Sequence, residues 1–156
     1  MLELGDDFTD LLVALHDEQV EYLLVGGWAM ALHGHARGTD DLDIWVRASP
    51  GNAQRVFRAL IRFGAPVDAH QVRAEDFEAE RYGYRFGQKP QLIEILTTVT
   101  GVDFDEAWPD RQTFELEGRS IPCIGRRALL ANKRAAGRPK DLADVAWLES
   151  QPEEPE

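Results

Sequence analysis

Two aspartates, Asp41 and Asp43, are the residues whose type and spacing most directly indicate chemistry. They belong to the alternating segment Asp-Leu-Asp-Ile-Trp-Val (41–46), which is typical of a β-strand. Because side chains alternate across a strand, both carboxylates are expected on one face, with Leu42 and Ile44 on the opposite, buried face. Neighbouring carboxylates repel each other unless a cation neutralises them, and Mg²⁺ prefers oxygen ligands. The pair therefore indicates either a divalent-metal site or two solvated aspartates at a strand start.

A Gly26-Gly27 pair precedes the aspartates. Residues 20–25 are short and apolar and predict a buried strand, and residues 28–33 predict a helix that ends at Gly34. Glycine lets backbone N–H groups approach an anion, and the N-terminus of the following helix favours negative charge. The pair is therefore expected either to bind phosphates or to form an ordinary tight turn.

Glu94 is the best candidate for a third carboxylate. It lies in the middle of the predicted strand 91–97, where burying a charge is costly. Either it joins the two aspartates at a metal site, or it faces solvent on a half-exposed strand. Asp103 and Asp105 are weaker candidates, because they fall in a predicted loop or helix start.

The charge of the chain is strongly acidic but uneven. Its net charge is −11, which disfavours a protein that coats nucleic acid over a long track. The segment 118–140, however, contains no aspartate or glutamate. Its basic residues are Arg119, Arg126, Arg127, Lys133, Arg134, Arg138 and Lys140. This segment predicts either a local anion site or a solvated basic face.

The length and composition fit one ordinary domain. The chain has 156 residues, of which 44% are apolar and 29% charged, and it has no apolar run long enough to span a membrane. The single cysteine, Cys123, excludes an intrachain disulfide. The acidic N-terminus has no signal-peptide features, so a cytoplasmic location without a membrane partner is expected. We expect a domain over residues 1–150 and a disordered acidic tail over 151–156.

Hydrophobic periodicity and capping residues predict the remaining elements. Helices are predicted from Asp6 onward, from Pro50 to Gly64, and over 103–108, 126–136 and 139–150; strands over 82–86, 111–117 and 119–124. The stretch 65–81 has no clear assignment. This order predicts an α/β (α+β) fold, with one mixed sheet flanked by helices.

Taken together, these segments resemble the nucleotidyltransferase superfamily of the DNA polymerase β type. Its pattern is a hydrophobic residue, Gly and Gly or Ser, then Asp-hydrophobic-(Asp/Glu)-hydrophobic, and a third carboxylate on a later strand. The matching positions are Gly26, Gly27, Asp41, Asp43 and Glu94. Glu94 stands where Asp is more usual, and Gly27 where Ser is frequent.

The flanking sequence resembles more closely the small stand-alone prokaryotic members of this superfamily, some of which are toxins. The matching segments are Arg-Gly-Thr-Asp-Asp-Leu-Asp (37–43), Ile-Leu-Thr (95–97) followed by Gly-Val-Asp-Phe (101–104), and Lys-Arg-Ala-Ala-Gly-Arg-Pro-Lys-Asp (133–141). The resemblance covers roughly residues 20–148.

The resemblance implies a nucleotidyltransferase-like sheet and a reaction with two Mg²⁺ ions. Asp41 and Asp43 would hold both ions, Glu94 would share one of them, and either Glu94 or a metal-bound carboxylate would receive a proton. An acceptor hydroxyl would then attack the α-phosphorus of an NTP, and pyrophosphate would leave. Lys133 would neutralise the β- and γ-phosphates.

The remaining nucleotide-binding residues implied by the resemblance are Gly26, Gly27, Arg37, Thr39 and Lys140. Two functions stay open. The first is an enzyme that moves NMP from ATP or another NTP to a small molecule, a protein or a tRNA end. The second is an inactive nucleotide-binding module that regulates or binds a partner, which the unusual Glu94 favours. A toxin-type member would have an antitoxin as its partner.

Overall fold

The computed structural model describes residues 4–35 and 39–152. The strands are β1 (Tyr22–Val25), β2 (Asp41–Val46), β3 (Gly83–Phe86), β4 (Leu92–Leu96), β5 (Gln112–Leu116) and β6 (Arg119–Cys123). They form one mixed sheet in the order β3-β4-β2-β1-β6-β5. The pairs β1–β2, β3–β4 and β5–β6 are antiparallel, whereas β2–β4 and β1–β6 are parallel. The predicted mixed sheet is therefore confirmed.

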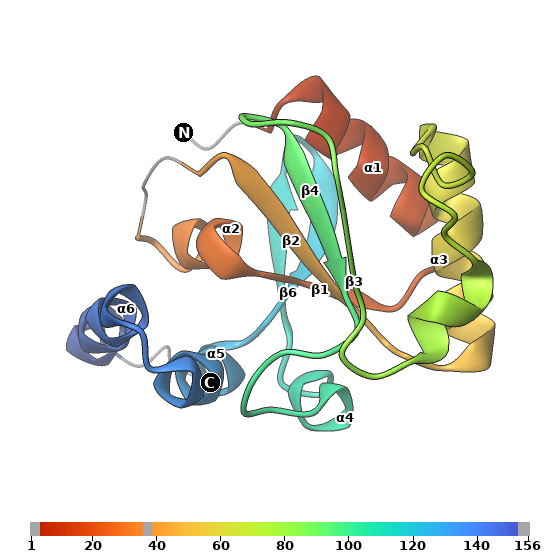
Figure 1. The fold of residues 1–156 in the computed structure, drawn as a ribbon. Coiled ribbons are helices and arrows are strands. Elements are labelled where there is room, and N and C mark those ends of the chain that lie inside the picture. The colour runs from red at the N-terminus through yellow and green to blue at the C-terminus, as the bar shows by residue number, and fades with distance from the viewer. Residues whose placement is uncertain (1–3, 36–38, 153–156) are drawn as a thin grey trace.

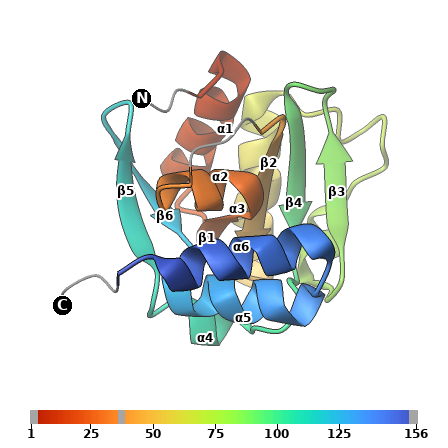
Figure 2. The ribbon, with the colours of Figure 1, turned by 90° about the vertical axis from the view of Figure 1, so that its left-hand side faces the viewer.

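Helices cover both faces of the sheet (Figure 1). They are α1 (Asp6–Asp17), α2 (Gly26–Leu32), α3 (Pro50–Phe63), the 3₁₀ helix η1 (Ala74–Glu78), α4 (Phe104–Ala107), α5 (Arg126–Ala136) and α6 (Pro139–Ser150). In Figure 1, α1 and α3 lie on one side of the sheet and α2, α5 and α6 on the other. Figure 2 looks onto this second side, where α5 and α6 cross in front of the strands.

The polar residue Asn52 joins α3 to the strands that carry the site. Its side chain is buried, and it accepts a hydrogen bond from the Glu21 N–H at 2.8 Å. Its amide nitrogen donates to the carbonyls of Glu21 at 3.0 Å and Arg47 at 2.9 Å. Since these residues flank β1 and β2, Asn52 fixes both strands against α3 with its buried polar groups satisfied.

The predicted elements agree with the structure except at their ends. The strand predicted at 20–25 begins at Tyr22, and the helix predicted at 28–33 already begins at Gly26. The unassigned stretch 65–81 contains only η1, whose Phe77 is buried. Of the predicted tail 151–156, residues 153–156 lie outside the described ranges, as does Arg37. Within those ranges, no helix is long and apolar enough to cross a membrane.

Candidate active site

The register of three strands brings Gly26, Asp43 and Glu94 side by side. In the parallel pair β2–β4, Asp43 lies opposite Glu94, and in the antiparallel pair β1–β2 it lies opposite Val25. Asp41 is two residues earlier on the same face of β2, while Leu42 and Ile44 are fully buried on the other face. The aspartate face therefore meets the turn that leads from β1 into α2.

Glycine is the only residue type that fits position 26 of this turn. Its φ of +70° lies in the left-handed region, and a Cβ at this position would overlap Asp43 Oδ2. A Cβ on Gly27 would come within 2.9 Å of Thr39 Oγ1. Thr39 in turn donates from its hydroxyl to the Asp41 carbonyl at 3.1 Å. The two glycines thus let the β1–α2 turn approach Asp43 and Thr39 closely.

The carboxyl of Asp43 is electrostatically unfavourable in its ionised form. Burial, followed by repulsion from Glu94 and Asp41, raises its pKa from 3.8 to about 6, although Arg85 and Lys140 act in the opposite direction. A pKa raised in this way indicates a position where a bound cation would be strongly attracted.

One oxygen of the Asp41 carboxylate has no hydrogen-bond donor among the described residues. Its Oδ1 is buried and makes no hydrogen bond with any residue in the described part of the chain. A buried carboxylate oxygen without a donor is costly, and a cation would satisfy it. This orphaned oxygen, next to the raised pKa of Asp43, fits a hard divalent ion such as Mg²⁺.

The Glu94 side chain pairs with an arginine and does not only neighbour the two aspartates. Its Oε2 forms an ion pair with Arg85 Nη2 at 3.2 Å, across the β3–β4 pair. Among the described residues, no three carboxylate, histidine or cysteine side chains are gathered as a ready metal site. Mg²⁺ is commonly held by one or two protein carboxylates together with substrate phosphates, so a complete protein cage is not required.

Two adjoining cavities meet at the aspartates. The first, here called the basic cavity, measures about 330 Å³. Its lining residues are Gly26, Gly27, Thr39, Asp40, Asp41, Asp43, Lys89, Lys133, Arg138 and Lys140. The second, the carboxylate cavity, measures about 340 Å³ and adds Arg85, Glu94 and the segment 98–100. Lys133, Arg138 and Lys140 line both cavities. Lys89 lines only the basic cavity, and Arg85 and Glu94 line only the carboxylate cavity.

Lys133 reaches these cavities from a fixed position. Its side chain is only 8% exposed, and Nζ lies 3.0 Å from Asp144 Oδ2 and 3.5 Å from Asp141 Oδ1. Arg138 Nε donates to Asp141 Oδ2 at 2.6 Å. Burial acts to raise the pKa of Asp141, but the hydrogen bond and charge of Arg138, with the charge of Lys133, hold it below its usual value. Lys133 is thus part of a buried charge network between α5 and α6.

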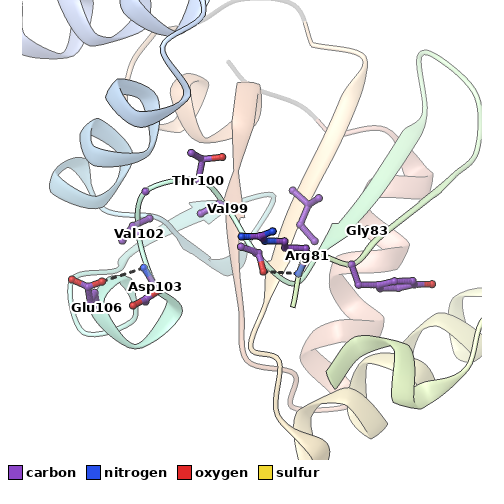
Figure 3. A pocket seen from close by; sticks show the side chains of 11 residues that line it. Arg81, Gly83, Val99, Thr100, Val102, Asp103 and Glu106 are labelled. Atoms are coloured by element: carbon purple, nitrogen blue, oxygen red, sulfur yellow. Dashed lines mark hydrogen bonds between the residues drawn. The ribbon is translucent and has the colours of Figure 1, made fainter. Parts of the chain in front are cut away.

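A third cavity, the side cleft, continues from the carboxylate cavity along β4. It measures about 730 Å³ and is lined by residues 81–83, 96, 98–103 and 106. Leu96 and the segment 98–100 line both cavities. Figure 3 shows the side cleft, with Arg81 on one side and Asp103 and Glu106 on the other. A molecule in this cleft would lie next to Glu94, because a Cβ on Gly83 would be 4.0 Å from Glu94 Oε2.

The structure gathers most of the predicted residues and adds three that were not among the predicted site residues. Gly26, Gly27, Thr39, Lys133 and Lys140 all line the basic cavity. The additions are Arg85, Lys89 and Arg138. Arg138 belongs to the segment 133–141 that carried the resemblance, and Arg85 becomes recognisable once β3 is paired with Glu94. No sequence pattern marks Lys89.

Comparisons with known proteins agree with this geometry. A family model described as aminoglycoside-2''-adenylyltransferase matches residues 7–148. Among solved structures, the lincosamide antibiotic adenylyltransferase LnuA, with lincomycin bound, superposes with a TM-score of 0.59 at 18% identity. That match covers 95% of this chain and 98% of LnuA.

A Thermotoga maritima protein assigned as a nucleotidyltransferase superposes with a TM-score of 0.56 at 17% identity, covering 96% of this chain and 98% of its own. At such low identity these two likenesses support the fold alone. A search of curated proteins finds no match.

Proposed function

This chain belongs to the aminoglycoside-2''-adenylyltransferase family and is a nucleotidyltransferase, and on that premise we propose that it transfers NMP from an NTP to a hydroxyl of a small molecule. ATP is the first candidate donor, and Mg²⁺ held by Asp41 and Asp43 is the proposed cofactor. The observation that carries the proposal is the orphaned Asp41 Oδ1 beside Asp43, at the junction of the basic and carboxylate cavities.

The triphosphate belongs on the basic side. Lys89, Lys140, Arg138 and Lys133 line that cavity, and the close approach of the Gly26-Gly27 turn exposes backbone there. These groups would attract and orient the β- and γ-phosphates. When bound, Mg²⁺ supplies Lewis-acid chemistry: it neutralises phosphate charge and makes an acceptor hydroxyl more acidic.

The proposed reaction transfers the nucleotidyl group of the NTP to the acceptor oxygen. The acceptor oxygen forms a bond to the α-phosphorus as the bond from that phosphorus to the β-phosphate oxygen breaks. Pyrophosphate leaves toward the cations of the basic cavity. Glu94, which faces the other side of Asp43, receives the hydroxyl proton, and its pairing with Arg85 holds it at the edge of the side cleft.

The acceptor belongs in the side cleft. Of the three acceptors compatible with the sequence, a small molecule is favoured over a protein or a tRNA end. The family description names aminoglycosides, which carry several amino groups, and a protein of net charge −11 attracts cations. In the cleft itself, the carboxylates of Asp103 and Glu106 outnumber the single cation of Arg81. An aminoglycoside hydroxyl is therefore the first acceptor to test.

The test uses α-³²P-labelled ATP and the other NTPs with kanamycin and lincomycin as probe acceptors, in the presence and absence of Mg²⁺. The wild-type protein is expected to label kanamycin, and the D41A/D43A variant to lose both transfer and Mg²⁺-dependent nucleotide binding. Asp10→Asn, at an exposed carboxylate on α1, is the matched control and is expected to retain activity. Unchanged nucleotide binding by D41A/D43A would refute the metal assignment, and labelling of lincomycin alone would refute the acceptor.

A further inference from the structure

The basic residues of the segment 118–140 line two different cavities. Lys133, Arg138 and Lys140 line the basic cavity, whereas three arginines surround a different cavity of about 320 Å³, here called the arginine pocket. Its lining residues are His33, Gln112, Arg126, Arg127, Leu130, Arg134, Trp147, Leu148, Gln151 and Pro152. None of these residues lines the basic or carboxylate cavity, and no aspartate or glutamate is among them.

The arginine pocket extends along α5, from Arg126 in its first turn to Arg134 in its last, beside the last turn of α6. The two helices run side by side in Figure 2. Arg134 of this pocket follows Lys133 in the chain, but the two side chains leave α5 in different directions and line different cavities. A ligand here would be distinct from the nucleotide of the basic cavity.

The Arg126 side chain is held in place by one hydrogen bond, but another of its N–H donors has no acceptor in the part of the chain that the structure describes. Its Nη2 donates to the Leu148 carbonyl at 3.1 Å, which holds the guanidinium between the two helices. Its Nε is buried and has no hydrogen-bond partner among the described residues. Such an N–H donor is seldom left unpaired in proteins, and an anionic oxygen is the partner it prefers.

The other two arginines are available to a ligand. Arg127 is exposed and makes no hydrogen bond or ion pair within the described part of the chain. Arg134 pairs with Glu149 at 3.3 Å, but both side chains are about half exposed, and such surface pairs exchange readily. Asp110 lies beside Gly125 at the start of α5 and does not line the pocket. The arginine pocket therefore keeps a positive charge in a strongly acidic protein.

One wall of the pocket is aromatic. Trp147 lines it and is half-buried, with the His35 ring 4.5 Å from its own ring. A planar guanidinium can bind a phosphate through two parallel hydrogen bonds, and an indole beside it can stack on a base. We propose that the arginine pocket is a second phosphate-binding site, which takes the phosphate of a free nucleotide or of a single-stranded nucleic acid. This inference does not depend on which acceptor the enzyme uses.

The test counts binding sites by calorimetric titration in EDTA. The probes are inorganic pyrophosphate, AMP and a 5′-phosphorylated RNA tetranucleotide. The R126A/R127A variant is compared with K89A/K140A, which removes the same number of charges from the basic cavity. Wild type is expected to bind two pyrophosphates. Each double variant should lose a different one, with its affinity reduced by about tenfold or more.

The AMP and RNA arms identify the source of the phosphate. Tighter binding of RNA than of AMP, weakened in Trp147→Leu, assigns the pocket to nucleic acid, and the reverse order assigns it to a free nucleotide. Because Arg126 contacts Leu148, the exposed Arg127→Glu variant serves as the version that is expected to fold normally. One site in wild type, or unchanged binding of every probe by both arginine variants, overturns the proposal. Transfer to kanamycin is measured separately, so that loss of the proposed activity is not confused with loss of this site.

Discussion

Replacing Asp43 by Asn should abolish nucleotidyl transfer and yet stabilise the metal-free protein. Burial and the neighbouring carboxylates raise the pKa of Asp43 from 3.8 to about 6, so the ionised form is disfavoured in the folded state. Each pKa unit corresponds to about 1.4 kcal/mol, which gives an upper limit of about 3 kcal/mol for the destabilisation by ionised Asp43. Asparagine has nearly the same shape without the charge.

The pH dependence follows from the direction of the shift. A carboxyl whose pKa is higher in the folded state binds its proton more tightly there, so wild-type stability falls as pH rises from about 4 to about 6. The advantage of Asp43→Asn should therefore be only about 0.5 kcal/mol at pH 4 and reach its full size above about pH 7. For a protein of this length, 3 kcal/mol corresponds to a Tm increase of roughly 6–12 °C.

Thermal unfolding in EDTA at pH 4, 5 and 8 measures this effect, with Asp10→Asn as the control for removing an exposed carboxylate. Added Mg²⁺ and ATP should stabilise wild type at pH 8 and leave the Tm of Asp43→Asn unchanged. If Asp43→Asn melts at or below the wild-type temperature at pH 8, or gains the same increment at pH 4 and pH 8, the electrostatic account of the site is wrong.

Four further variants test separate parts of the site. Glu94→Gln should reduce the single-turnover transfer rate by about 10²–10⁴-fold while nucleotide affinity stays unchanged, because only the proton acceptor is lost. Asp144→Asn should lower the free energy of unfolding in urea by about 3 kcal/mol, since it leaves the buried Lys133 with a single carboxylate. Gly26→Ala should cost about 1–3 kcal/mol in the same assay and weaken nucleotide binding, because of its positive φ and the overlap with Asp43. Gly83→Leu should raise the acceptor KM by about tenfold without changing nucleotide affinity, since the leucine side chain fills the side cleft. An equal loss of nucleotide binding would contradict the placement of acceptor and nucleotide in separate cavities.

The sequence was sufficient for the elements that carry the carboxylates. Strict alternation over 41–46 and the charge within the apolar strand 91–97 identified the strands, and the Gly-Gly pair identified the turn between them. What alternation could not supply was the register of β3, which depends on pairing across the sheet. The Arg85–Glu94 ion pair was consequently not predicted.

Charge counting could not show that the residues of the basic segment 118–140 line two cavities. Counting charges over 118–140 suggested one anion site, but successive residues of a helix point about 100° apart. Lys133 therefore lines the basic cavity and Arg134 the arginine pocket, although they are neighbours in the chain. The loop that contains Lys89 has no periodicity at all, so its approach to the aspartates follows only from the folded path.

The charge network between α5 and α6 makes the position of Lys133 depend on the last helix of the chain that the structure describes. Pairing of β2 with β4 sets Asp43 opposite Glu94. The buried Lys133, however, has Asp141 and Asp144 as carboxylate partners only when α6 supplies them. A nascent or proteolysed chain that ends before Pro139 would carry the acidic half of the site and lack the ordered cations. On the proposed function, such a chain would lack the positioned Lys133 that binds the phosphates of the NTP.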